Sequence, residues 1–123
     1  MKVLLDTHVV LWALADDPRL TPTHRDFFGD TDTELYVSSV TIWEIAIKSG
    51  LGKLDAPDDI QNILLAGGCR PLPISWRHAE AVGTLPALHA DPFDRLLIAQ
   101  AQVEQLRLAT SDERILEYEV MVV

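Results

Sequence analysis

The sequence is poor in cysteine and in positive charge. Cys69 is the only cysteine among 123 residues, which excludes an internal disulfide and any zinc site built on several thiolates. Lys and Arg number 10 against 19 Asp and Glu, giving a net charge of −9. Proteins that bind nucleic acid by neutralising phosphates are usually basic, so this balance argues against tight non-specific binding of DNA or RNA. It allows a nuclease that holds cations in an acidic pocket.

Long hydrophobic runs are also missing. No apolar run approaches the roughly 20 residues of a membrane span, so no membrane association is expected. The first residues imitate a signal peptide, with Lys2 before an apolar stretch and small residues at 13 and 15, but Asp6 and His8 interrupt the stretch. We therefore expect a cytoplasmic protein. Its length and its 48% of apolar residues suit a single globular domain over residues 1–123.

Short apolar runs alternate with helical patterns along the chain. Strands are predicted at residues 2–5, 35–38, 70–74, 106–109 and 119–123. Helices are predicted at residues 8–15, 22–28, 42–49, 58–65, 76–83, 92–105 and 113–117. This alternation indicates an α/β fold with a parallel sheet, and the two prolines in 70–74 confine that strand to an edge.

Several polar residues have the positions and side chains of helix N-caps. Thr7 is expected to cap the helix over 8–15, and either Ser39 or Thr41 the helix over 42–49. Ser75 and Asp91 are expected to cap two later helices, the second with Pro92 at its first position.

Four acids are expected to meet at one edge of the sheet. Asp6 ends the first strand, and Asp112 lies just past the strand over 106–109. Glu44 and Asp94 lie in the first turns of helices that follow strands and therefore begin at the same edge. Clustered carboxylates repel one another unless a cation joins them, and oxygen ligands favour Mg²⁺ or Mn²⁺. Such ions support in-line displacement at phosphorus.

Each acid also has an ordinary structural interpretation. Asp112 can cap a helix, Asp94 can complement a helix dipole, and Glu44 can pair with Lys48 four residues later. Asp6 has the weakest alternative, because a carboxylate ending a buried strand gains nothing from packing. Asp91 is better explained as a cap than as a ligand.

The remaining polar residues carry weaker signals. Thr110 and Ser111 are candidates to orient water or phosphate, or simply to end a strand and cap the next turn. The histidines are scattered, without the spacing of metal ligands; they are His8, His24, His78 and His89.

Four motifs in order carry a family resemblance. They are Leu4-Leu5-Asp6-Thr7-His8, then Ser38-Ser39-Val40-Thr41-Ile42-Trp43-Glu44 running on to Lys48, then His89-Ala90-Asp91-Pro92-Phe93-Asp94-Arg95, and last Thr110-Ser111-Asp112. With these motifs the chain resembles, over essentially its whole length, a PIN-domain ribonuclease of the VapC toxin type.

The resemblance implies more than the residues alone. It implies a three-layer α/β/α sandwich with strand order 3-2-1-4-5, and Asp6, Glu44 and Asp94 as core acids with Asp112 as the fourth. It implies Mg²⁺- or Mn²⁺-dependent cleavage of cellular RNA, a homodimer, and a cognate VapB-like antitoxin whose C-terminal segment blocks the site. Arg95, beside Asp94, would contact substrate phosphate or hold its loop.

Three other functions compete with this one. The same acids would serve a metal-dependent DNA nuclease or a phosphatase. A PIN-like module that only binds protein is the non-catalytic alternative. A phospho-receiver domain is disfavoured, because Asp6 is the only acid after the first strand and no lysine follows the late strand.

Overall fold

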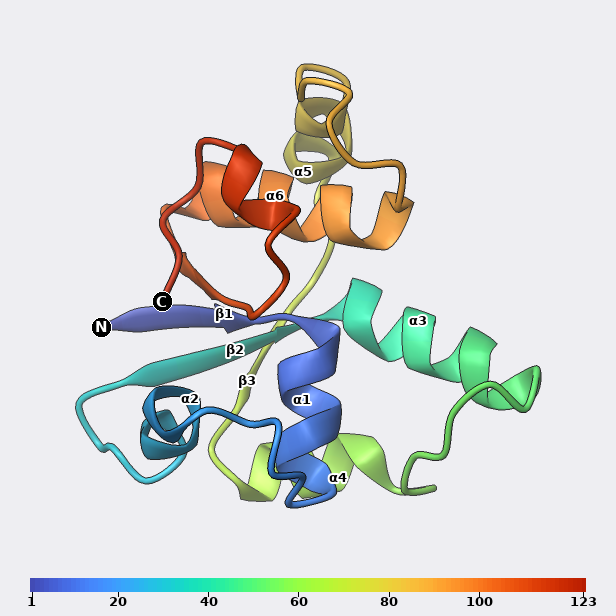
Figure 1. Cartoon of the computed structure of the whole chain (residues 1–123), viewed down its shortest axis with the longest axis vertical. Helices are drawn as coiled ribbons and strands as arrows, with labels where there is room; N and C mark the ends of the chain where they lie inside the picture. The colour runs from blue at the N-terminus through green and yellow to red at the C-terminus, as the bar shows by residue number, and fades with distance from the viewer.

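The computed structural model describes residues 1–123 and has four parallel strands flanked by helices (Figure 1). The strands are β1 (Lys2–Leu5), β2 (Glu34–Ser38), β3 (Arg70–Leu72) and β4 (Arg107–Ala109). The helices are α1 (Thr7–Leu14), α2 (Pro22–Phe27), α3 (Ser39–Gly50), α4 (Ile60–Ala66), α5 (Trp76–Val82) and α6 (Pro92–Glu104), followed by the 3-10 turn η1 (Ile115–Glu117). The predicted α/β class is confirmed.

The sheet runs in the order β3-β2-β1-β4, with every neighbouring pair parallel. Val3 on the central strand β1 lies between Leu35 of β2 and Arg107 of β4. The edge position predicted for the proline-containing strand is confirmed, although β3 ends at Leu72.

The expected fifth strand over 119–123 is reduced to one parallel bridge between Leu108 and Val122. Only two backbone hydrogen bonds join the segment to Leu108, from the Leu108 N–H to Met121 and from the Val123 N–H to Leu108. Just before them, the Val120 N–H turns back to the Tyr118 carbonyl, which keeps the segment from extending earlier. The order 3-2-1-4 is therefore correct, and the fifth position holds a bridge rather than a strand.

Both faces of the sheet are buried, as a parallel sheet requires. Val3 and Leu5 point into a core shared with α1, α2 and α4, whereas Leu4 and Leu108 point into a second core shared with α6 and η1. Figure 1 shows α1, α2 and α4 on one side of the strands and α5 and α6 on the other. Alternation along β1 thus produces the three layers.

Two helix N-caps differ from the sequence prediction. Asp6, not Thr7, caps α1, because its Oδ1 accepts the Val9 N–H at 2.8 Å. Ser38 caps α3, so this helix begins at Ser39. The caps predicted for Ser75 and Asp91 are confirmed. No helix has the length and apolar character needed to cross a membrane.

Candidate metal centre

Asp6 lies where β1 ends and α1 begins, with 3% of its surface exposed. Its carboxylate caps α1 through Val9. Burial raises the pKa of Asp6, and the Val9 N–H and the side chain of Thr110, the residue that follows β4, only partly offset the rise. The fold therefore holds a carboxylate here at a cost to its charged form.

Glu44 lies in the second turn of α3 and is as buried as Asp6. Thr7 donates its hydroxyl to Oε1 of Glu44 at 2.7 Å, and the Lys48 ammonium pairs with Oε2. The pair with Lys48, which the sequence offered as the structural alternative, is therefore present. Pairing with Glu44 raises the pKa of Lys48. A surface ion pair would leave its carboxylate in water, whereas this one is enclosed.

Asp94 lies in the first turn of α6, three residues after Asp91, the N-cap of this helix. Burial raises the pKa of Asp94, the charges of Asp91 and Glu44 raise it further, and a hydrogen bond to His89 opposes them. The His89 Nε2 lies 2.8 Å from Oδ2 of Asp94. The effect of Glu44 on this pKa places two of the predicted acids in one electrostatic environment.

Asp112 lies in the loop after β4, where its backbone N–H donates to the Thr110 hydroxyl at 3.0 Å. Arg114 forms a two-pronged ion pair with it, from Nε to Oδ1 at 3.1 Å and from Nη2 to Oδ2 at 2.9 Å. Hydrogen bonding to Arg114 lowers the pKa of Asp112.

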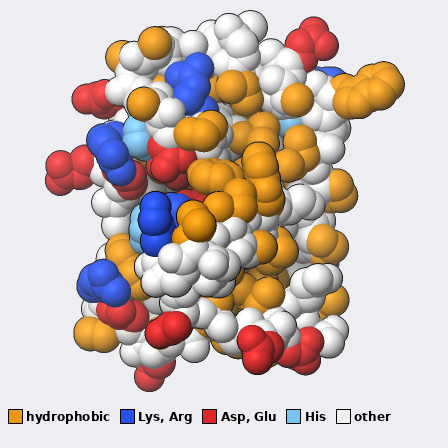
Figure 2. All heavy atoms as spheres, turned by 90° about the vertical axis from the view of Figure 1, so that its right-hand side faces the viewer, with side chains coloured by type: hydrophobic (Ala, Val, Ile, Leu, Met, Phe, Trp, Pro, Cys, Tyr) orange, Lys and Arg blue, Asp and Glu red, His pale blue; other side chains and the backbone are white.

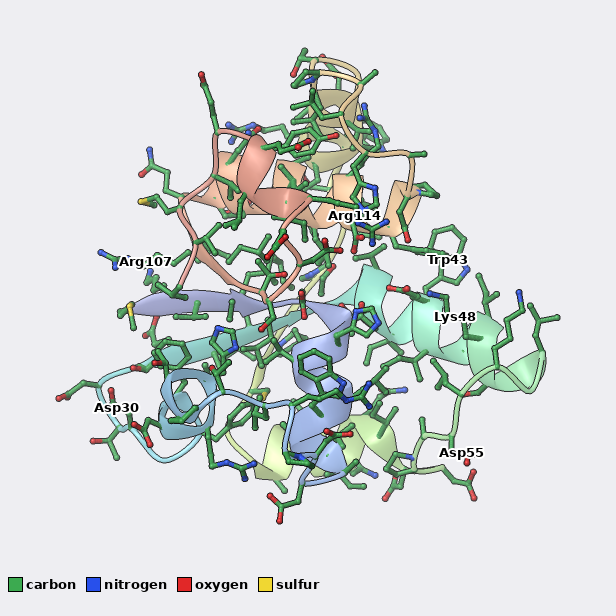
Figure 3. All side chains as sticks on the ribbon, in the orientation of Figure 1. Asp30, Trp43, Lys48, Asp55, Arg107 and Arg114 are labelled. Carbon is green, nitrogen blue, oxygen red and sulfur yellow. The ribbon has the colours of Figure 1, made fainter.

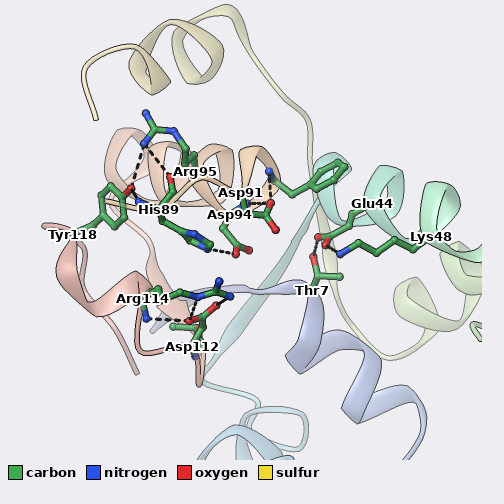
Figure 4. Close-up of polar contacts among 12 residues, drawn as sticks. Thr7, Glu44, Lys48, His89, Asp91, Asp94, Arg95, Asp112, Arg114 and Tyr118 are labelled. Carbon is green, nitrogen blue, oxygen red and sulfur yellow. Dashed lines mark hydrogen bonds and ion pairs between the residues drawn. The ribbon is translucent and has the colours of Figure 1, made fainter. Parts of the chain in front are cut away.

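The tightest group of metal-ligating atoms joins two predicted acids with one residue that was not predicted. Ligand atoms of His89, Asp94 and Asp112 lie within 4.8 Å of one another. In Figure 4 the carboxylates of Asp94 and Asp112 face each other, and Glu44 points toward the same space from α3. Asp6 and Glu44 stand outside this 4.8 Å group.

His89 was missed because the histidines show no ligand spacing in the sequence. It precedes Asp94 by five residues, and the α6 cap lies between them, so neither helical nor strand periodicity relates the two. Its position inside the motif that contains Asp94 was the one available signal.

This donor set fits a hard divalent cation. Two carboxylates and an imidazole converge, and Asp6 and Glu44 add two buried carboxylates outside that group. Carboxylate oxygens suit Mg²⁺ and Mn²⁺, whereas the His89 Nε2, 2.8 Å from Oδ2 of Asp94, is placed to orient that carboxylate. The raised pKa values of Asp6 and Asp94 are those of carboxylates that a bound cation would stabilise.

Comparison with known proteins identifies the fold family. The family model described as PIN domain matches residues 3–120. The chain belongs to the PIN-domain family. It is also 31% identical over 116 residues to ribonuclease VapC22 of Mycobacterium tuberculosis, covering 92% of this chain and 88% of that protein. The resemblance to VapC proteins drawn from the motifs is thereby confirmed.

Solved structures show the same fold. VapBC2 of Rickettsia felis, bound to a promoter DNA fragment, matches with a TM-score of 0.74 and 16% identity, over 100% of this chain and 98% of that one. DNA-bound VapBC of Salmonella typhimurium matches with a TM-score of 0.71 and 18% identity, over 100% and 97% of the two chains.

The other candidate residues of this PIN domain have different surroundings. Arg95 turns away from the acids, and its guanidinium donates to the Pro86 carbonyl at 2.9 Å and to the Tyr118 hydroxyl at 3.2 Å. Figure 4 shows it on the far side of His89. Thr110, which directly follows β4, is buried, and the neighbouring Ser111 is exposed. A hollow of about 460 Å³ adjoins Glu44 and Thr7 and is lined in part by His8 and Trp12.

Proposed function

We propose that this PIN domain is a divalent-metal-dependent endoribonuclease that acts as the toxin of a toxin–antitoxin pair. The observation that carries the proposal is the convergence of Asp94 and Asp112, with His89, at the carboxyl edge of the sheet. Asp94, Asp112, Asp6 and Glu44 would hold Mg²⁺ or Mn²⁺. When bound, such an ion supplies positive charge to a phosphodiester and activates water for attack at phosphorus.

The chain's own side chains would orient these ligands. Thr7 fixes Oε1 of Glu44, and a hydrogen bond from Thr41 to the Thr7 hydroxyl, at 3.2 Å, fixes Thr7 in turn. His89 fixes Oδ2 of Asp94. Hydrogen bonds of this kind set the direction of a ligand's lone pairs and so its affinity for metal. The Thr110 hydroxyl accepts the Asp112 backbone N–H and would hold the start of the loop that carries Asp112.

RNA would enter beside Glu44. The hollow there brings Lys48 and Lys53 together in a chain that has few cations. His8 and Trp12 lie in the same wall with ring centroids 5.8 Å apart, and aromatic rings of this kind stack on unpaired bases. The cations would meet phosphates while the acids hold the metal.

A VapB-like antitoxin is the proposed partner, because the structural neighbours are toxin–antitoxin complexes. An apolar hollow of about 440 Å³ between α3, α4 and β3 supports it, with Trp43 and Leu65 more than half exposed at its wall. Figure 2 shows hydrophobic side chains gathered on this side of the molecule next to charged ones. Patches of this kind mark protein-binding surfaces. We also propose a homodimer located in the cytoplasm.

The test is cleavage by the purified protein with Mg²⁺ or Mn²⁺, using labelled RNA, DNA and phosphate monoesters. We expect RNA to be cut internally, and Asp94→Asn to abolish cutting. Asp30→Asn is the matched control, since Asp30 is exposed and lies at the opposite end of the molecule from Lys48 and Arg114 (Figure 3). Cleavage of DNA or monoesters with RNA left intact would replace the ribonuclease with one of the rival enzymes. No cleavage and no metal binding would favour the non-catalytic module.

A further inference from the structure

Arg114 occupies the oxygens of Asp112 that a metal ion would need. The Arg114 backbone N–H and Nε both donate to Oδ1, at 3.0 and 3.1 Å, and Nη2 donates to Oδ2 at 2.9 Å. A carboxylate offers about four lone-pair positions, and Arg114 uses three of them. The guanidinium also brings a positive charge to the place where a divalent cation would bind.

The same local geometry occurs once more in the chain, at Asp17 and Arg19. There the backbone N–H and Nε of Arg19 donate to Oδ1 of Asp17 at 2.8 and 3.1 Å, and Nη2 donates to Oδ2 at 2.8 Å. An Asp-x-Arg turn therefore forms this pair by itself. The contact alone says nothing about function.

The surroundings separate the two pairs. Asp17 belongs to no group of converging metal-ligating atoms, whereas Asp112 does. Asp112 has ligand atoms within 4.8 Å of Asp94 and His89. Figure 4 shows the Arg114 guanidinium beside Asp112, on the side that faces Asp94. One of the two Asp-x-Arg turns therefore lies within the candidate metal site formed by His89, Asp94 and Asp112.

The Arg114 side chain can also rotate away from Asp112. Its side chain is 65% exposed, against 19% for Asp112, and its guanidinium hydrogen bonds go to Asp112 alone. Rotation about its side-chain bonds would carry the guanidinium into solvent and leave the more buried carboxylate in place.

We propose that Arg114 is a displaceable counter-ion, which neutralises Asp112 and gives up its oxygens when a divalent cation binds. This inference rests on the metal site of the proposed function. It makes Arg114 a positioning residue that keeps the acids together and sets the affinity of the site for metal. Removing Arg114 should therefore strengthen metal binding, although a residue beside a ligand usually supports it.

Mn²⁺ affinity, measured by calorimetry on the whole protein without RNA, tests the proposal. We expect Arg114→Gln to bind Mn²⁺ about two- to fivefold more tightly than the wild type, the range set by the strength of a partly exposed ion pair. Arg114→Lys keeps the charge but cannot grip both oxygens, so an intermediate gain is expected. Arg19→Gln removes the matched pair outside the acidic site and should leave the affinity unchanged.

Three results would overturn the inference. Weaker binding by Arg114→Gln would mean that Arg114 orients Asp112 for the metal. Tighter binding by Arg114→Gln with no change in Arg114→Lys would reduce the effect to charge acting at a distance. Absence of Mn²⁺ binding by the wild type would remove the metal site itself, and this outcome is read from the wild type before any variant is compared. Circular dichroism establishes that each variant is folded.

Discussion

Lys48 provides the most direct test of how this PIN domain keeps a carboxylate inside its fold. Glu44 is 3% exposed and accepts one hydrogen bond from Thr7 and one from Lys48. Lys48→Met keeps roughly the length of the side chain but removes the ammonium, which lies 5.9 Å from the centre of the Phe93 ring. The substitution removes the charge and leaves a buried carboxylate with a single donor.

The loss in free energy of unfolding caused by Lys48→Met should lie between two known limits. Exposed ion pairs contribute less than about 1 kcal/mol, and breaking a fully buried pair costs about 3–5 kcal/mol. Because the Lys48 side chain is one-third exposed and Glu44 is enclosed, we expect a loss of about 2 kcal/mol in the free energy of unfolding. For 123 residues, this corresponds to a fall of about 8 °C in melting temperature.

The assay is thermal unfolding in EDTA and again in saturating Mn²⁺. The loss should shrink in Mn²⁺, because the ion would supply the charge that Lys48 no longer provides. In a Glu44→Gln background, Lys48→Met should cost little, since no buried charge is left unpaired. Lys53→Met is the control, because Lys53 is exposed and makes no ion pair. An equal loss with and without Glu44 would refute the reasoning.

The further predictions concern three other buried residues. Asp6→Asn should leave the melting temperature in EDTA equal or higher, because burial raises the pKa of Asp6 and Asn also caps helices, while the rise with Mn²⁺ disappears. Gln100→Leu should lower the free energy of urea unfolding by about 2–3 kcal/mol, because Ser38 and His78 lose a buried partner. Burial raises the pKa of the Cys69 thiol, so a thiol reagent at pH 8 should modify the folded protein far more slowly than the urea-unfolded chain. The Cys69 thiol of the unfolded chain loses its proton at a lower pH than the thiol of the folded protein. The free energy of unfolding should therefore fall as pH rises above about 8.5, and Cys69→Ala should remove that fall.

The layers of the fold could be predicted because they depend on local patterns. The apolar run of β1 sends Val3 and Leu5 to one core and Leu4 to the other, which is the behaviour of a strand buried on both faces. Pro92 at the start of α6 and the Asp91 cap are equally local signals. A strand that ends in Asp6 pointed to the site for the same reason, since nothing nearby in the sequence explains a buried acid there.

The details that escaped prediction depend on contacts between distant segments. Asp6 replaced Thr7 as the cap of α1 because the Thr7 hydroxyl is directed to Glu44, 37 residues away in the sequence. The segment after Tyr118 forms a bridge instead of a strand because only Leu108 pairs with it. His89 joins Asp112 across the loop that follows β4. No periodicity within one element reports such pairings.

The acids of the candidate site differ in how they are neutralised, and this difference predicts how each would respond to a metal ion. Glu44, Asp94 and Asp112 each have a cationic or imidazole partner within five residues in the sequence: Lys48, His89 and Arg114. The chain can therefore bring three carboxylates together while each carries its own partner, which limits the repulsion that clustering would cause. Asp6 has no such ion pair, and the Val9 N–H and the nearby Thr110 side chain only partly offset the effect of burial on its pKa. A bound cation would exchange one favourable partner for another at Asp112, but would give Asp6 the ion-pair partner that it lacks, so Asp6 has the most to gain from the metal.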